Sequence, residues 1–231
     1  MPGYLDLLAQ LGVGGAHPGG FMLTKEIIEL EMIPESASIL DAGCGTGQTL
    51  QFLKSLHYNV TGLDIDPIML IKAKNRLKED KCLVQGSVEN LPFKDKQFDF
   101  IFCESVLSFT DSVQSLRELN RVMKDNGVLL AIEVTGTDQP DRKLKEKIQS
   151  FYGFHHLFNV EEWKSAIKSA GFQKIEVRTE DDFIIEEDEP TTEFDMSDNL
   201  DPVYFDMLAE HEKLREAYHL AVQFRIFRCV K

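Results

Sequence analysis

The chain has 231 residues, of which 43% are hydrophobic and 28% are charged, a composition typical of ordinary globular proteins. No apolar run reaches the roughly 18 residues that a membrane span needs, and the N-terminus lacks the basic and apolar regions of a secretory signal. The net charge of −14 comes from residues 180–212, which hold fourteen acids and no Lys or Arg. The rest of the chain is balanced, so we expect neither a nucleic-acid partner nor a membrane partner.

The cysteine pattern predicts reduced thiols and a cytoplasmic protein. The four cysteines are scattered and form no C-x-x-C pair: Cys44, Cys82, Cys103 and Cys229. We therefore expect neither a disulfide nor a metal site.

The N-terminal region, residues 1–36, is expected to be an arm followed by a helix. Five of the fifteen glycines lie between Gly12 and Gly20, which indicates a flexible loop. The apolar periodicity of Phe21–Ile33 predicts a helix after this loop.

From residue 38 onward, short strands alternate with helices. Strands are expected at 38–42, 58–65, 82–87, 98–105, 128–134, 173–179 and 222–230, and helices at 47–57, from Pro67 onward, and at 112–124, 160–170 and 204–220. Asp66, Asp111 and Asn159 are expected to cap the helices that follow them. The alternation predicts an α/β fold in one domain, 1–231, built as a doubly wound three-layer sandwich.

A glycine-rich turn follows the first of these strands. "SILDAGCGTGQTL" (Ser38–Leu50) spaces Gly43, Gly45 and Gly47 as G-x-G-x-G, one residue short of the dinucleotide fingerprint. Asp64 ends the second strand about 20 residues later, where a carboxylate can accept both hydroxyls of a ribose. This arrangement suits NAD and S-adenosylmethionine alike.

The acid inside the turn distinguishes these two ligands. Asp41 would repel the pyrophosphate of NAD, which a helix N-terminus otherwise favours. S-adenosylmethionine carries no phosphate, and its sulfonium and ammonium groups would be attracted by the same carboxylate. We therefore predict S-adenosylmethionine as the cofactor and keep an NAD-dependent oxidoreductase as the weaker alternative.

Several segments resemble one known family. "ILDAGCGTG" is similar to motif I of the class I S-adenosylmethionine-dependent methyltransferases, and "VTGLDIDPIMLIKAK" to their ribose-binding segment. "GSVENLPFKDKQFDFIFCESVLSF" resembles the adenine-binding loop and next strand of the small-molecule, methyltransferase type 11-like branch. The resemblance covers about residues 36–180. It implies a Rossmann-like sheet of seven mostly parallel strands, with an antiparallel last strand at Val222–Val230.

The resemblance also implies a set of cofactor-binding residues. The methionine portion is assigned to Asp41, Gly43 and Gly45, the ribose to Asp64, the adenine to Ile65, Ser87 and Val88, and the ammonium to the carbonyl of Cys103. Ser87 departs from the family pattern, which often has an acid at this position. The usual side-chain contact to adenine is therefore shortened or missing, and the Val88 amide remains.

The residues after the fourth strand restrict the acceptor. "CESVLSF" lacks the Asp/Asn-Pro-Pro-aromatic motif of enzymes that methylate nucleic-acid bases or glutamine, and Cys103 is not part of a Pro-Cys pair. We therefore expect transfer of a methyl group from S-adenosylmethionine to a small molecule by in-line displacement. A cofactor-binding sensor or scaffold without catalysis is the alternative. The oligomeric state stays open.

Two residues are candidates for catalysis. Glu104 ends the fourth strand beside the expected methyl group, where it would bind an amine, act as a base or serve as a structural carboxylate. His17 lies in "GGAHPGG", which would act as a lid or belong to a disordered arm.

Residues 136–158 and 181–219 fall where the family often builds a substrate cap. The first contains "FYGFHHLF", whose Tyr152, Phe154 and Phe158 would line an apolar pocket with His155 and His156, or pack in the core. The second contains the acidic stretch. It would attract a cationic substrate or basic partner, or, as we favour, form a solvated loop.

Overall fold

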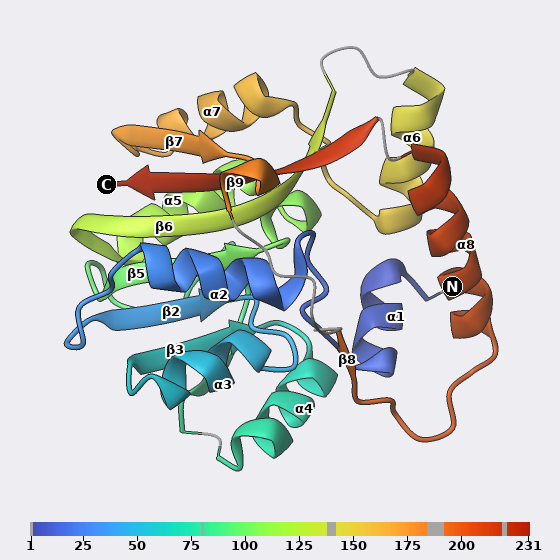
Figure 1. Ribbon diagram of the computed structural model, residues 1–231, viewed down its shortest axis with the longest axis horizontal. Helices are drawn as coiled ribbons and strands as arrows, with labels where there is room; N and C mark the ends of the chain where they lie inside the picture. Colours follow the sequence, from blue (N-terminus) through green and yellow to red (C-terminus); the bar gives the residue numbers. More distant parts are fainter. Residues whose placement is uncertain (1, 80, 138–141, 184–191, 219–220) are drawn as a thin grey trace.

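The central element is a seven-stranded sheet (Figure 1). Its strands are β2 (Ser38–Ala42), β3 (Asn59–Asp64), β4 (Leu83–Gln85), β5 (Phe98–Glu104), β6 (Met123–Gly136), β7 (Lys174–Arg178) and β9 (Val222–Val230). They lie in the order β4-β3-β2-β5-β6-β9-β7, and β9 runs antiparallel to both of its neighbours. The predicted fold class is therefore confirmed. The computed structural model describes residues 2–79, 81–137, 142–183, 192–218 and 221–231.

Helices cover both faces of this sheet. One face carries α2 (Gly20–Leu30), α3 (Gln48–Ser55) and α4 (Pro67–Leu77), and the other carries α5 (Ser112–Val122) and α7 (Val160–Ser169). Successive strand residues point to opposite faces. Ile39 accordingly packs into the core beneath α2 and α3, whereas Leu40 packs into the core beneath α5 and α7. Two apolar cores therefore hold the three layers together.

The predicted helix caps are present. Oδ1 of Asp66 accepts hydrogen bonds from the amides of Ile68 at 2.7 Å and Met69 at 3.2 Å, and Pro67 occupies the first turn. Asp111 caps α5 in the same way, and Asn159 forms a reciprocal capping box at the start of α7. Such caps satisfy amides that lack partners within the helix. They start three of the helices at the predicted positions.

Three further helices gather beyond one end of the strands (Figure 1): α1 (Tyr4–Leu11), α6 (Arg142–Tyr152) and α8 (Val203–Tyr218). Helix α1 contacts both α6 and α8. The sequence analysis anticipated α8 but neither α1 nor α6. Helix α1 has only eight residues, with buried Leu7 and Leu11 one turn apart. Its apolar periodicity is therefore too short to distinguish a helix from an irregular arm in the sequence.

Part of the acidic stretch is docked onto the N-terminal region. The short strand β8 (Glu193–Phe194) pairs antiparallel with β1 (Val13–Gly14). Arg76 of α4 pairs with Glu193 at 2.6 Å, and the Lys72 ammonium contacts the carbonyl of Asp195. We call residues 192–197 the strap. Its side chains are largely exposed, as we expected for a solvated loop, but its backbone is paired with β1. Residues 184–191 lie outside the described part of the chain.

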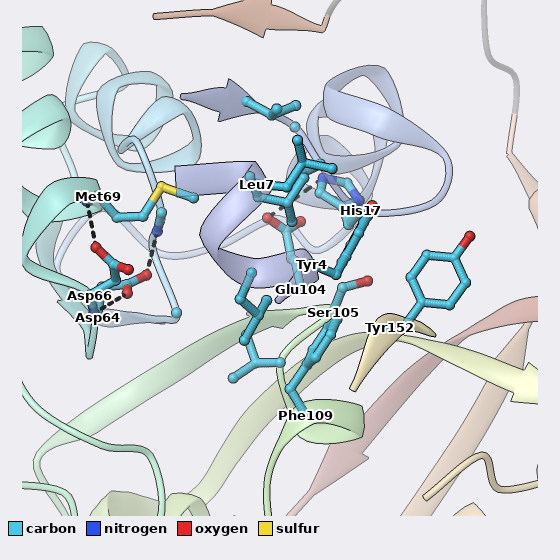
Figure 2. Close-up of a pocket in the computed structure, with 18 of the residues that line it drawn as sticks. Tyr4, Leu7, His17, Asp64, Asp66, Met69, Glu104, Ser105, Phe109 and Tyr152 are labelled. Carbon is cyan, nitrogen blue, oxygen red and sulfur yellow. Dashed lines mark hydrogen bonds and ion pairs between the residues drawn. The ribbon is translucent and has the colours of Figure 1, made fainter. Parts of the chain in front are cut away.

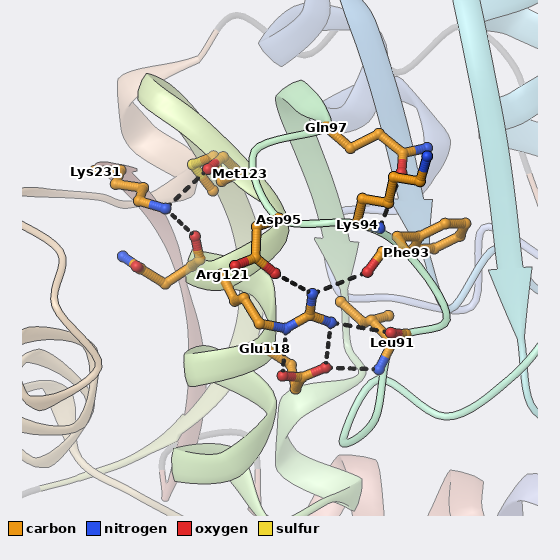
Figure 3. A network of polar contacts seen from close by, with 10 residues as sticks. Leu91, Phe93, Lys94, Asp95, Gln97, Glu118, Arg121, Met123 and Lys231 are labelled. Carbon is orange, nitrogen blue, oxygen red and sulfur yellow. Dashed lines mark hydrogen bonds and ion pairs between the residues drawn. The ribbon is translucent and has the colours of Figure 1, made fainter.

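An ionic network fixes the segment between β4 and β5 (Figure 3). The guanidinium of Arg121 donates to the carbonyls of Leu91 at 3.0 Å and Phe93 at 2.9 Å. It also pairs with Asp95 and Glu118, and Glu118 accepts from the Leu91 amide at 2.8 Å. These bonds hold the loop that follows Ser87 and Val88. Two short 3-10 turns, η1 (Leu107–Phe109) and η2 (Glu180–Asp182), complete the fold. Within the described ranges, no helix combines the length and apolarity needed to cross a membrane.

Candidate active site

A cavity of about 1200 Å³ opens beyond the ends of β2, β3 and β5 and extends to α1, α6 and α8. Small-molecule sites usually occupy about 300–1,000 Å³, so this cavity has room for a cofactor and a second molecule. Figure 2 shows Asp64 and Asp66 at one side, Tyr152 at the other, and His17 with Glu104 between them.

The glycine loop shapes the first side of the cavity. Gly43 has φ +86° and Gly45 has φ +53°, left-handed values that side chains disfavour. A Cβ on Gly43 would lie 2.3 Å from Val106, whereas a Cβ on Gly45 would meet nothing within 4 Å. Gly43 therefore permits close packing against the turn after β5. Gly45 leaves its backbone open to a ligand.

Asp64 is fixed at the end of β3 by the loop itself. Its Oδ2 accepts a hydrogen bond from the Gly45 amide at 2.8 Å, and its Oδ1 accepts one from the Asp66 amide at 2.9 Å. Burial raises the pKa of Asp64, against the effect of these amides. Each oxygen keeps a further lone pair, so the carboxylate can still accept from a ligand.

Asp41 is almost fully buried on the cavity wall, and the ion pairs of the described residues include none to its carboxyl group. Burial raises the pKa of Asp41 well above its ordinary range, and the nearby charges of Glu104 and Asp64 raise it further. Among the described residues, Asp41 Oδ2, Thr46 Oγ1 and Ser105 Oγ have no hydrogen-bond partner, and all three residues line this cavity. Buried polar atoms without partners are uncommon in native folds. The site therefore suits a ligand that is polar and carries positive charge.

The other predicted cofactor residues have different surroundings. Ile65, Ser87 and Val88 line the same cavity as Asp64. Ile65 is 65% exposed, so its side chain can cover a flat ligand, and Ser87 Oγ accepts from the Glu89 amide at 3.1 Å. Cys103 lies fully buried in the core. Glu104 at the end of β5, and Ser105 and Val106 directly after the strand, line the cavity.

The two predicted catalytic residues lie in one hydrogen-bonded network. His17 Nε2 lies 3.1 Å from Thr24 Oγ1, which donates to Glu104 Oε1 at 2.6 Å. Glu104 Oε2 accepts from Thr49 Oγ1 at 2.9 Å and lies 3.9 Å from His17 Nε2. His17 Nδ1 lies 3.1 Å from the carbonyl oxygen of Pro18. The loop that holds His17 therefore reaches the end of β5.

Sequence reasoning missed the residue that joins this pair. Thr24 is fully buried, on the face of α2 that also carries Leu23, Ile27 and Ile28. The sequence did offer a signal: Thr24 lies at helical spacing among apolar residues, which predicts that its hydroxyl is buried. A buried hydroxyl needs a hydrogen-bond partner.

The predicted aromatic run divides between the cavity and the core. Tyr152, Phe154 and His155 line the cavity, whereas Phe158 packs edge-on against the buried Trp163, with ring centroids 5.1 Å apart. His156 stacks on Phe158. Sequence reasoning missed Tyr4 and His211, which line the same cavity from α1 and α8.

Comparison with known proteins agrees with this geometry. Residues 40–131 match the family model described as a methyltransferase domain. The chain is 41% identical over 224 residues to an uncharacterized methyltransferase, YodH, of Bacillus subtilis, covering 94% of each chain. It is 36% identical over 131 residues to a demethylmenaquinone methyltransferase of Thermotoga maritima, covering 55% of this chain and 56% of the relative.

A solved structure of a Haemonchus contortus phosphoethanolamine N-methyltransferase, in complex with S-adenosyl-L-methionine, has a similar fold. It superposes with a TM-score of 0.76 at 21% identity, covering 98% of this chain and 57% of that one. The chain belongs to the class I S-adenosylmethionine-dependent methyltransferases. The predicted family, enzyme class and methyl donor are thereby confirmed, in preference to the nicotinamide alternative.

Proposed function

We propose that this enzyme methylates a hydroxyl group of a small molecule, with Glu104 taking the hydroxyl proton and His17 coupled to Glu104 through Thr24. The observation that carries the proposal is the His17–Thr24–Glu104 network, whose two ends, His17 and Glu104, line the same cavity as the glycine loop. A general base is needed where the acceptor arrives protonated, as a hydroxyl does.

The residues at the first side of the cavity are suited to holding the cofactor. When bound, S-adenosylmethionine supplies a methyl group that is transferred from its sulfonium by in-line displacement. Asp41 would supply the opposite charge for its cationic portion, Asp64 would accept from its ribose, and Ile65 and Val88 would enclose its adenine. The unpartnered Oδ2 of Asp41 and the open backbone at Gly45 support this assignment. The carbonyl of Cys103 stays a predicted contact.

Hydrogens can be placed in two ways so that each of the three contacts, Pro18–His17, His17–Thr24 and Thr24–Glu104, is a hydrogen bond. The carbonyl of Pro18 can only accept, so Nδ1 of His17 carries a hydrogen. In the first arrangement, Nε2 of a charged His17 donates to Thr24, which donates to an ionised Glu104. In the second, a protonated Glu104 donates to Thr24, which donates to a neutral His17.

Removing one proton leaves the network one hydrogen short. Thr24 can then donate to Glu104 or to His17, but not to both. As the acceptor oxygen is methylated, its proton passes to the carboxylate of Glu104, and Thr24 then donates to Nε2 of His17, which restores the missing hydrogen bond. The proton-deficient form is therefore the base, and Thr24 is a positioning residue that couples its two ends.

The names of related proteins support a small-molecule acceptor without naming one. They include the demethylmenaquinone methyltransferase above and a malonyl-[acyl-carrier protein] O-methyltransferase of Pectobacterium atrosepticum, which is 36% identical over 106 residues. Because these relatives have different acceptors, we infer that the cap, and not the shared glycine loop, selects the acceptor.

The test is transfer of a labelled methyl group to a panel of phenols and alcohols across a range of pH. The wild-type kcat/KM is expected to rise with pH as the network loses its proton. Glu104→Gln should abolish this rise and lower kcat/KM by about 10²–10⁴-fold, the usual contribution of a general base. Thr24→Val should weaken the rise with pH, because it removes the hydroxyl that links Glu104 to His17.

Thr49→Val is the matched control. It removes another hydroxyl that donates to Glu104 but that makes no contact with His17 among the described hydrogen bonds. We expect this variant to retain the pH dependence. A Glu104→Gln enzyme with the wild-type profile would contradict the proposal.

A further inference from the structure

The second side of the cavity is lined by aromatic rings from four segments of the chain. We call Tyr4, Phe109, Tyr152, Phe154 and His211 the aromatic chamber. Tyr4 comes from α1, Phe109 from η1, Tyr152 from the end of α6 and His211 from α8. None of these segments belongs to the central sheet. The chamber therefore lies outside the central sheet and is separate from the residues assigned to the cofactor.

The rings contact one another edge-to-face, stacked or tilted. The Tyr4 and Tyr152 centroids are 4.8 Å apart at an interplanar angle of 84°, and the Tyr152 and Phe154 rings are stacked 5.2 Å apart at 18°. Phe109 meets Phe154 edge-on at 4.9 Å, and Tyr4 lies 5.4 Å from His211. Offset and edge-to-face contacts are the favoured geometries of aromatic pairs. A further planar ring can extend such a cluster.

Two polar side chains of the chamber contact each other. Tyr152 Oη lies 3.1 Å from His211 Nδ1, within hydrogen-bond distance. Burial lowers the pKa of His211, and burial raises the pKa of Tyr152 to about 12. Both groups are therefore neutral near pH 7. Beside them, Arg215 pairs with Glu212 at 2.9 Å.

We propose that the aromatic chamber is the acceptor subsite and that it binds a neutral, planar aromatic compound bearing a hydroxyl. This inference rests on the proposed function, which supplies the hydroxyl and its base. The chamber offers ring faces, and the opposite charges of Arg215 and Glu212 beside it are paired with each other. An anionic acceptor would share the cavity with Asp41, Asp64 and Glu104, which would repel it. A neutral ring avoids this repulsion, and its hydroxyl is the group that the proposed function requires.

The experiment is calorimetric titration of the full chain with three probes of similar size, in the presence of saturating S-adenosylhomocysteine. Naphthol is the neutral aromatic probe, decalol is its saturated counterpart, and aminomethylnaphthalene is its cationic counterpart. Naphthol is expected to bind more tightly than both of the others. Aromatic contacts of this kind account for about a two- to tenfold preference.

Variants locate the binding. Tyr152→Leu should weaken naphthol binding by about two- to tenfold, whereas Tyr152→Phe, which keeps the ring, should retain it. Phe205→Leu is the matched control, because Phe205 lies on α8 with 51% of its surface exposed and is not among the cavity-lining residues. It should leave naphthol affinity unchanged. All four proteins should bind S-adenosylhomocysteine with the same affinity, which verifies their folding.

The outcomes separate this inference from the proposed function. Failure of the wild type to bind S-adenosylhomocysteine would refute the cofactor site and the inference together. If S-adenosylhomocysteine binds but decalol or the ammonium probe equals naphthol, the inference alone is overturned. An undiminished naphthol affinity in Tyr152→Leu would also overturn it.

Discussion

Replacing Glu133 with glutamine should change how the stability of the protein depends on pH. Glu133 lies on β6, is fully buried, and supports the turn between β5 and α5. Its Oε1 accepts from the amides of Val106 at 3.0 Å and Leu107 at 2.8 Å. Its Oε2 accepts from the amide of Ser108 at 3.2 Å and from the Ser108 hydroxyl at 2.7 Å. This one carboxylate therefore anchors the turn that carries Phe109.

The magnitude follows from the pKa of this group. Burial raises the pKa of Glu133 from 4.5 to about 7, although the bonds from Ser108, Leu107 and Val106 act in the opposite direction. One pKa unit corresponds to about 1.4 kcal/mol, so the difference amounts to about 3 kcal/mol. Because the folded-state pKa is raised, this contribution is fully present below pH 4.5 and is lost as the pH rises through about 7.

The assay is urea unfolding of wild type and Glu133→Gln between pH 4 and pH 8.5. Glutamine does not titrate, so the variant lacks this pH-dependent loss. The free energy of unfolding of wild type should fall relative to that of the variant by about 3 kcal/mol across the range. A difference that stays constant with pH, or a wild type that gains stability relative to the variant, would refute the reasoning. Such a result would mean that the hydrogen bonds to Glu133 affect its pKa at least as strongly as burial does.

Two further predictions concern the cofactor side of the cavity. Arg76→Ala removes the pair with Glu193 of the strap and the bond to the Thr46 carbonyl at 2.9 Å, so the Kd of S-adenosylhomocysteine should rise about fivefold by calorimetry. Lys96→Ala, which removes an exposed pair with Asp125, is the control, and equal affinities in the two variants would contradict a role for the strap. Asp41→Asn should raise the Tm of the free protein, because it removes a buried carboxylate that lacks a full set of partners, and should reduce the Tm increase caused by S-adenosylmethionine. A lower Tm of the free variant, or an unchanged effect of the ligand, would show that Asp41 is already neutralised within the protein.

The sheet could be predicted because its signals are local. Strands rich in apolar residues alternate with helices that begin at Asp66, Asp111 and Asn159, and each of these caps uses residues two or three positions away. The glycine loop was equally readable, because the left-handed backbone at Gly43 and Gly45 requires glycine. These parts of the fold depend on near neighbours in the sequence.

The cap could not be predicted because its contacts join distant parts of the chain. Tyr4 meets Tyr152 and His211 only after α1, α6 and α8 have assembled. Thr24 reaches Glu104 across 80 positions, and β1 pairs with a strand about 180 residues away along the chain. Single-sequence periodicity carries no information on such pairings. Glu104 and His17 could be proposed separately, but not their connection.

The most direct test of the account is a calorimetric titration of the wild-type protein with S-adenosylmethionine, S-adenosylhomocysteine and NAD, all on one preparation. The glycine loop, Asp41 and Asp64 predict micromolar binding of both sulfur ligands and no binding of NAD. Binding of NAD alone would contradict the account, because the buried carboxyl group of Asp41 would then lie beside a pyrophosphate.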